Sequence, residues 1–321
     1  MTSSLPPEVQ QVFDRFITTE YTTIDANGQP ITWPVTPYYK PGDACVSVTT
    51  GLGYPKKADD ATRNPYVGLL FSDQTGSGMD KAPMVLVQGI ADVDDRDLEA
   101  NRDRYWHEAK EKLPAAAKRQ PPAFIRKQLN WYYTRIYVHV RPERVYVWPE
   151  GDASVEPQLF DCHLDEVRSG HDEEPEREPA APSGRPADWD ERLDALGSRT
   201  YPTAVLTIVA PDGFPFSIRL PVHPDQQAGC IRFGVDALGV PVAAGRACLA
   251  AHVHEPEFTW QMNFQVRGDL VEHDGEWVLI PHKYVGGFNV PKKQSALWRE
   301  IFSKQGGFRK KAKAELAKRG R

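Results

Sequence analysis

The chain of 321 residues is poor in cysteine, with four in all and no Cys-x-x-Cys pair. This scarcity argues against a zinc knuckle or a dithiol redox pair and favours a reducing compartment. No apolar run approaches the roughly 18 residues that a membrane-spanning helix needs. The first residues also lack the basic and apolar regions of a secretory signal. We therefore expect a cytoplasmic protein with no membrane partner.

Neither sign of charge dominates the chain. Lysine and arginine number 39 and aspartate and glutamate 44, giving a net charge of −5, so no nucleic-acid partner is indicated. We find no Gly-x-Ser-x-Gly, P-loop or Gly-x-Gly-x-x-Gly motif, which removes several enzyme classes. Apolar residues at 40% and charged residues at 26% are typical of a globular protein, and the length predicts two domains.

Two segments have a biased charge. Residues 151–180 hold ten acidic residues and two arginines. Such a segment buries too little apolar surface to offset the entropy that is lost when it becomes ordered. We expect an acidic, flexible linker over 151–188, with an acidic binding segment as the alternative. Residues 303–321 hold eight basic residues and one glutamate. A solvated helix or frayed tail is expected there, although such a tail also attracts anions.

Three short patterns occur in both halves of the chain in the same order. The first is a hairpin with an Asn-Gly or Asp-Gly turn, then Gly-x-Pro and Pro-Val; the second is a strand around Val-x-Gly; the third begins with proline. They occupy 22–35 and 207–222, 87–93 and 266–272, and 142–145 and 281–284. Because order and spacing are both preserved, the sequence predicts a duplicated β domain.

The first half reads as strands with a few helices. Strands are predicted at 20–26, 29–37, 44–50, 66–72, 83–93 and 135–148, and helices at 6–16, 57–63, 97–113 and 121–132. The second half has no counterpart of the two later helices. We expect a mainly β fold of two tandem barrels, at 1–150 and 189–302, with a helical insert in the first and a basic tail at 303–321.

A pair of lysines follows the third predicted strand. That strand ends in Thr49-Thr50, and Lys56-Lys57 come after a turn rich in glycine and proline. Hydroxyls, a helix N-terminus and an ammonium group are together suited to bind an oxyanion such as a phosphate. Spacing alone does not separate this interpretation from two ordinary surface lysines.

In order and spacing, these motifs resemble the pyridoxamine 5′-phosphate oxidase-like split β-barrels. The matching residues are Gly28-Gln29-Pro30, Pro34-Val35, Thr49-Thr50, Lys57, Asn64-Pro65 and Val87-Gln88-Gly89-Ile90-Ala91. The resemblance covers about 18–148 and, more weakly, 198–290. It implies a cofactor, either FMN or an 8-hydroxy-5-deazaflavin coenzyme.

The resemblance also implies roles for seven residues. The cofactor phosphate is expected at Lys57, Lys56, Thr49 and Thr50, and the isoalloxazine ring at Val35 and Thr36 with Gln88 near its edge. The chain departs from the family pattern at Asp59, where many members have a second basic residue. It also lacks the arginine-rich substrate segment of the oxidase, so vitamin B6 phosphate is not the expected substrate.

Family barrels pair around the cofactor, so the resemblance implies an intrachain pseudo-dimer, with a homodimer also possible. The second copy lacks the lysine motif, and Arg246 is the one basic residue in its equivalent region, 233–251. We therefore expect that copy to be degenerate and each chain to bind one cofactor. The predicted activity is a flavin- or deazaflavin-dependent oxidoreductase acting on a small molecule, with no acid or base assigned. The alternative is a non-catalytic protein that binds flavin, deazaflavin or haem.

His252 and His254 alternate in a predicted strand, so both point to one face. With Glu255 and His282 they form a conceivable set of metal ligands. Solvated polar side chains are the simpler interpretation, and we assign no metal.

Overall fold

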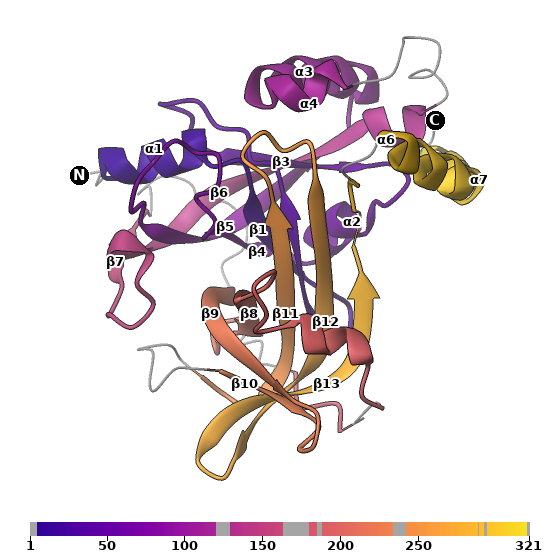
Figure 1. The fold of residues 1–321 in the computed structure, drawn as a ribbon. Helices are drawn as coiled ribbons and strands as arrows, with labels where there is room; N and C mark the ends of the chain where they lie inside the picture. The colour runs from indigo at the N-terminus through magenta and orange to yellow at the C-terminus, as the bar shows by residue number, and fades with distance from the viewer. Residues whose placement is uncertain are drawn as a thin grey trace.

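Two β structures, one from each half of the chain, lie one above the other in the computed structural model (Figure 1). The structure describes residues 5–119, 129–162, 180–184, 188–233, 242–287, 289–291 and 294–319. The fold is mainly β, as the sequence predicts. No helix within these ranges is both long and apolar enough to cross a bilayer.

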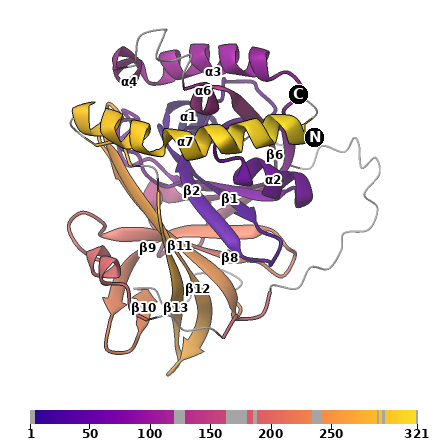
Figure 2. The same ribbon diagram turned by 90° about the vertical axis from the view of Figure 1, so that its right-hand side faces the viewer.

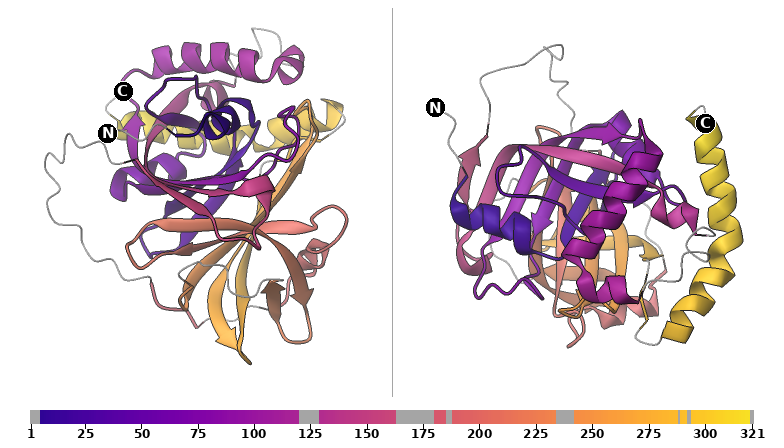
Figure 3. Two further views of the ribbon diagram at one scale, coloured as in Figure 1. Left: turned by 90° about the vertical axis from the view of Figure 1, so that its left-hand side faces the viewer. Right: turned by 90° about the horizontal axis from the view of Figure 1, so that it is seen from above.

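The first half forms an antiparallel sheet in the order β2-β1-β4-β5-β6-β3, with β7 paired to β6. Its strands are β1 (Thr19–Ile24), β2 (Pro30–Val35), β3 (Val46–Gly51), β4 (Tyr66–Phe71), β5 (Met84–Asp94), β6 (Arg135–Trp148) and β7 (Gln158–Asp161). Its helices are α1 (Pro7–Arg15), α2 (Lys56–Arg63), α3 (Leu98–Lys112), α4 (Pro114–Lys118), α6 (Asn130–Tyr133) and the short η1 (Pro149–Gly151). The six predicted strands are confirmed, with ends shifted by at most two residues. Figure 3 shows α1 and α3 on the side of this sheet away from the second half.

The second half repeats the strand order of the first. Its elements are η2 (Glu191–Ala195), β8 (Thr203–Val209), β9 (Pro215–Asp225), β10 (Cys230–Phe233), β11 (Gly245–His254), β12 (Gln261–His273) and β13 (Glu276–Gly286). The order β9-β8-β11-β12-β13-β10 matches the first sheet strand for strand. Here β10 pairs with both β9 and β13, so the six strands close into a barrel. The two halves expected from the sequence are therefore a sheet in the first half and a closed barrel in the second.

A bulge at the same place in each half strengthens the case for duplication. The register shifts between Gln88 and Gly89 in β5 and again between Arg267 and Gly268 in β12. A Cβ on Gly89 would lie 2.4 Å from the carbonyl oxygen of Arg141, and one on Gly268 would lie 2.5 Å from that of Ile280. Glycine is therefore required at both bulges because the neighbouring backbone leaves no room for a side chain.

The structure adds to what the sequence predicts for three segments. The expected linker contains the strand β7 near its start, paired with β6, while 163–179 and 185–187 lie outside the described residues. Of the predicted helix 121–132, the structure describes the last turn as α6; residues 120–128 lie outside its ranges. Of the two expectations for 303–321, a helix or a frayed tail, the structure shows the helix: these residues end α7 (Gln294–Lys318), which lies across the first half (Figure 2).

The two halves meet through hairpins β1–β2 and β8–β9. Thr22 and Thr32 are cross-strand neighbours in one hairpin, and Thr207 and Ser217 are neighbours in the other. Their hydroxyls form a closed ring of buried hydrogen bonds at 2.9, 3.3, 2.9 and 2.8 Å. Apolar packing continues across the same contact: the second hydrophobic core includes Leu70, Leu86 and Trp148 from the first half. The contact therefore resembles a domain interior, with polar groups that pair one another.

A buried charged network also joins the halves. Glu20 of β1 is fully buried and accepts hydrogen bonds from Arg219 of β9 at 2.8 Å and from His252 of β11 at 2.5 Å. His254 lies 3.5 Å from Asp73, and its ring is parallel to that of His252. The expectation that these histidines are solvated is wrong: both side chains are buried. Alternation along β11 does bring them to one face, and that face is the contact between the halves.

This network predicts that the protein loses stability in acid. Burial lowers the pKa of His254 below its ordinary 6.5, even though Asp73 opposes the shift. For Glu20 and Asp73 burial raises the pKa, but His252 and Arg219 outweigh it and the net shift of each is downward. All three groups bind more protons unfolded than folded, so stability falls as pH drops below about 6.5 and falls further below about 4.5.

The measurement is the urea midpoint of the parent and of His254→Gln between pH 7.5 and 4. We expect the parent's midpoint to fall once the pH drops below about 6.5, and the variant to lose less between pH 6.5 and 5. A midpoint for the parent that is flat down to pH 4 would contradict the assignment.

Candidate functional site

The candidate site lies where β3 ends and α2 begins. Gly51, the last residue of β3, pairs with Arg135, the first residue of β6. A Cβ on Gly51 would lie 3.1 Å from the Tyr54 ring, and one on Gly53 would lie 2.8 Å from the Trp131 ring. The two glycines therefore let aromatic side chains close over the turn. Helix α2 follows Pro55 with no side-chain cap, so its first turn keeps open N–H donors.

Lys57 is half-buried at the first turn of α2, with its Nζ 5.6 Å from the centroid of the Tyr54 ring. Among the described residues its ammonium group has no acidic partner. Burial, followed by the positive charge of Arg135, lowers the pKa of Lys57 to about 8. A half-buried cation whose charge is unfavourable in the free protein is suited to gain from a bound anion.

Two other residues expected at the cofactor phosphate already interact with groups of the protein. The Nζ of Lys56 lies 2.8 Å from Asp60 and 3.9 Å from Asp25, so its charge is balanced. Thr50 is buried and its hydroxyl donates to the Tyr54 carbonyl at 2.8 Å. Thr49, by contrast, is half-buried and its hydroxyl makes no hydrogen bond to another described residue. Among the described residues, Lys56 and Thr50 therefore have polar partners within the protein, whereas Lys57 has no acidic partner and the Thr49 hydroxyl has no hydrogen bond.

Arg135 is the residue that sequence reasoning missed. It is 5% exposed, and its guanidinium donates to the hydroxyls of Tyr54 at 3.1 Å and Tyr105 at 2.8 Å. It also lies 4.1 Å from the Tyr105 ring centroid and 4.2 Å from that of Tyr132. Its Nε is buried with no partner in the described part of the chain. A lone arginine at the start of an apolar strand carries no local signal, because only the pairing of β6 with β3 places it here.

The residues expected along the cofactor ring lie at the end of β2, just after it and on β5. Val35 ends β2 and Thr36 follows it, and both are half-buried. Gln88 is 1% exposed in β5, and its amide nitrogen donates to the carbonyl of Pro215 in β9 at 3.1 Å. Gln88 thus lies in the contact between the halves, and its expected place near the ring edge stays a prediction.

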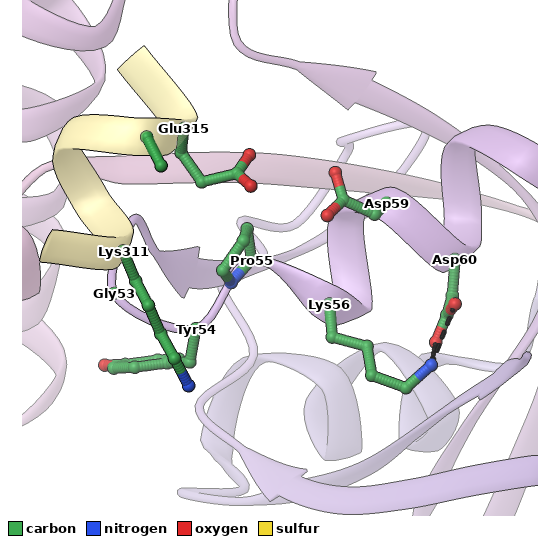
Figure 4. A pocket seen from close by; sticks show the side chains of 9 residues that line it. Gly53, Tyr54, Pro55, Lys56, Asp59, Asp60, Lys311 and Glu315 are labelled. Atoms are coloured by element: carbon green, nitrogen blue, oxygen red, sulfur yellow. Dashed lines mark hydrogen bonds and ion pairs between the residues drawn. The ribbon is translucent and has the colours of Figure 1, made fainter. Parts of the chain in front are cut away.

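A pocket of about 520 Å³ opens beside the cluster, between the turn, α2 and the C-terminal helix (Figure 4). Its lining comprises Gly53, Tyr54, Pro55, Lys56, Asp59, Asp60, Lys311, Ala314 and Glu315. Helix α7 is held there by Phe308, which stacks on Trp131 at 4.6 Å, and by Lys318, which pairs with Asp59 at 2.9 Å. The expected tail therefore forms one wall of the pocket, with Lys311 as its basic residue. Asp59, where the family pattern is basic, anchors this helix.

Comparison with known proteins finds no matching family model and no matching curated protein. Among solved structures, the chain is similar to a putative pyridoxamine 5′-phosphate oxidase from Listeria innocua, with 14% identity over 45% of this chain and 98% of that one and a TM-score of 0.32. It is also similar to an F420 reductase, with 14% identity over 44% and 98% and a TM-score of 0.33. A third similar structure is HutZ, the haem storage protein of Vibrio cholerae, with 17% identity over 45% of this chain and 94% of that one and a TM-score of 0.33. Each of these three likenesses covers less than half of this chain.

Proposed function

We propose that this protein is an oxidoreductase that binds the phosphate-bearing end of a flavin or deazaflavin coenzyme at Lys57 and Thr49. The observation that carries the proposal is the Lys57 ammonium, half-buried beside a second cation and with no acidic partner in the described chain. Such a group is costly in the free protein and is stabilised by a bound anion.

The donors at the site fit a phosphate. Thr49 offers a hydroxyl, Lys57 an ammonium group and the uncapped start of α2 its N–H groups. Each of these groups can donate to an oxyanion, and the helix N-terminus adds a favourable field. When bound, the coenzyme supplies hydride chemistry, while the protein orients it and keeps water out of the pocket. No acid or base of this chain is needed for that role.

We also propose that the second half forms a wall beside the coenzyme ring, away from the pocket at Tyr54. In support of this, β2, which ends at Val35, lies against β11 and β12 of the closed barrel. Arg246 of β11 donates to the carbonyl of Asn27 in the β1–β2 turn and is therefore engaged in the contact between the halves. On this proposal the chain is an internal pseudo-dimer with a single phosphate-binding site, at Lys57 and Thr49.

The test is a fluorescence titration of the purified protein with FMN and, separately, with the 8-hydroxy-5-deazaflavin coenzyme. We expect saturation at one coenzyme per chain, followed by a redox change of the bound coenzyme when NADPH and candidate acceptors are added. Failure to bind either coenzyme would contradict the proposal. Two equivalent coenzyme sites per chain would contradict the claim of a single phosphate-binding site. Binding without any redox change would support a carrier instead, as would haem that displaces the bound coenzyme.

A further inference from the structure

We infer that the end of α7, residues 308–319, is a hinged lid that swings at Gly306-Gly307 and opens and closes the pocket beside Tyr54. These residues are called the C-terminal lid below. The hinge itself does not depend on the proposed function. Its effect on the exchange of a coenzyme rests on that function, so the two can be tested apart.

Two adjacent glycines interrupt α7 directly before the C-terminal lid. Gly306 and Gly307 are both exposed and lie within a helix of 25 residues. No atom of the described chain lies within 4 Å of where a Cβ on either residue would stand, and neither has a positive φ. Neither close packing nor backbone conformation therefore requires glycine here. Because glycine destabilises a helix interior relative to alanine, the pair weakens α7 at the point where the lid begins.

One face of the C-terminal lid packs on the first half of the chain. The Phe308 ring stacks on Trp131 with the ring centroids 4.6 Å apart, and it meets the Tyr54 ring edge-on at 6.1 Å. Ala312 is buried in the first hydrophobic core, and Leu316 packs against the same core. A spacing of four residues brings the three lid side chains to one face of the helix. The lid is therefore closed by a narrow apolar stripe.

Ion pairs hold the far end of the C-terminal lid. Lys318 lies 2.9 Å from Asp59, and Arg319 lies 3.1 Å from Asp59 and also pairs with Asp95. The Lys318 side chain is 57% exposed, and exposed ion pairs contribute little and are screened by salt. Seven of the twelve lid side chains are exposed. Few apolar contacts and exposed ion pairs are typical of segments that open locally while the rest of the protein stays folded.

The closed lid forms one side of the pocket. Lys311, Ala314 and Glu315 line the pocket from the lid, and Tyr54 lines it from the turn before α2 (Figure 4). The ammonium group of Lys57 lies 5.6 Å from the centroid of the Tyr54 ring. The lid therefore closes over the same tyrosine against which the proposed coenzyme-binding lysine packs. A coenzyme held at Lys57 enters and leaves when the lid is open.

The first experiment follows amide hydrogen exchange in the full-length, coenzyme-free protein by mass spectrometry. In the parent, lid amides should exchange at least about a hundredfold faster than those of the buried strand β4. The double variant Gly306→Ala, Gly307→Ala should slow lid exchange about tenfold, because alanine favours the straight helix over the bent one. Phe308→Ala should speed it, since the stack on Trp131 is lost.

Lys313→Ala is the matched control for the glycine variant. Lys313 is an exposed residue of the same helix and lies beyond the hinge. Its replacement by alanine leaves both glycines and the apolar stripe unchanged. Lid exchange in this variant should therefore be that of the parent, and β4 exchange should be the same in all of the proteins.

The second experiment measures coenzyme exchange by stopped-flow fluorescence, with FMN or, if FMN does not bind, with the deazaflavin coenzyme. In the double glycine variant the association and dissociation rate constants should both fall about tenfold. The dissociation constant should change little, because the lid must open both for entry and for exit.

The outcomes separate the lid from the proposed function. Equal lid exchange in the parent and in the double glycine variant would overturn the hinge. Parent lid amides that exchange as slowly as those of β4 would also overturn it, and this result needs no variant to fold. Unchanged coenzyme rate constants in the double glycine variant would overturn the lid's control of exchange and leave the proposed function intact. If neither coenzyme bound, the proposed function would fail, and hydrogen exchange alone would uphold or overturn the hinge.

Discussion

Replacing Arg219 by methionine is expected to lower the free energy of unfolding by about 3–5 kcal/mol at pH 7. Arg219 donates to Glu20 at 2.8 Å, and Glu20 is fully buried in the contact between the halves. The variant would leave that carboxylate in an apolar interior with His252 as its remaining basic partner. Removing one partner of a buried ion pair is costly because the other charge stays desolvated. Urea denaturation followed by tryptophan fluorescence gives the value.

The same barrel provides a control for the Arg219 substitution. Arg232 pairs with Asp225 at 3.2 Å and with Glu276 at 2.8 Å, but these ion pairs are partly exposed at the surface. Arg232→Met is therefore expected to cost no more than about 1 kcal/mol. In the double variant Arg219→Met, Glu20→Gln, part of the lost stability should return because the buried charge is gone. Equal losses for Arg219→Met and Arg232→Met would show that the buried network does not hold the halves together.

Replacing Lys57 by alanine is expected to weaken FMN binding at least tenfold. A charge-assisted hydrogen bond to an anion contributes about 1.5–3 kcal/mol. The free protein should not lose stability, because burial already lowers the pKa of Lys57 to about 8 and makes its charge unfavourable there. Fluorescence titration measures the affinity, and thermal unfolding of the cofactor-free protein measures the stability.

Lys56 is the matched control for Lys57, as its neighbour in sequence and in the same first turn of α2. Its ammonium is neutralised by Asp60 and Asp25, so Lys56→Ala should change FMN affinity much less than Lys57→Ala. Arg246→Ala is also expected to have a smaller effect, because Arg246 is engaged with the Asn27 carbonyl. If Lys56→Ala and Lys57→Ala weakened FMN equally, the distinction drawn from their ion pairs would be wrong.

Local sequence patterns predict much of this fold. Strand positions follow from alternation, and the hairpins follow from Gly28 and Gly213, which both adopt the positive φ of a tight turn. Repetition of the patterns around Gly89 and Gly268 predicts the duplication, and the equal strand orders and equal bulges agree with it. These features depend on residues a few positions apart, so they can be predicted from the local sequence.

Tertiary structure decides which charges remain free. Lys56 and Lys57 are indistinguishable in the sequence, yet carboxylates from α2 and from the β1–β2 turn neutralise one and not the other. Arg135 comes more than seventy residues after Lys57 and reaches it only because β6 pairs with β3. The histidines of β11 gave no sign of meeting Glu20 until the halves packed together. Ion pairing depends on which distant strands become neighbours, and the free-energy cost of burying a charge depends on the groups around it. Neither property can therefore be predicted from the local sequence.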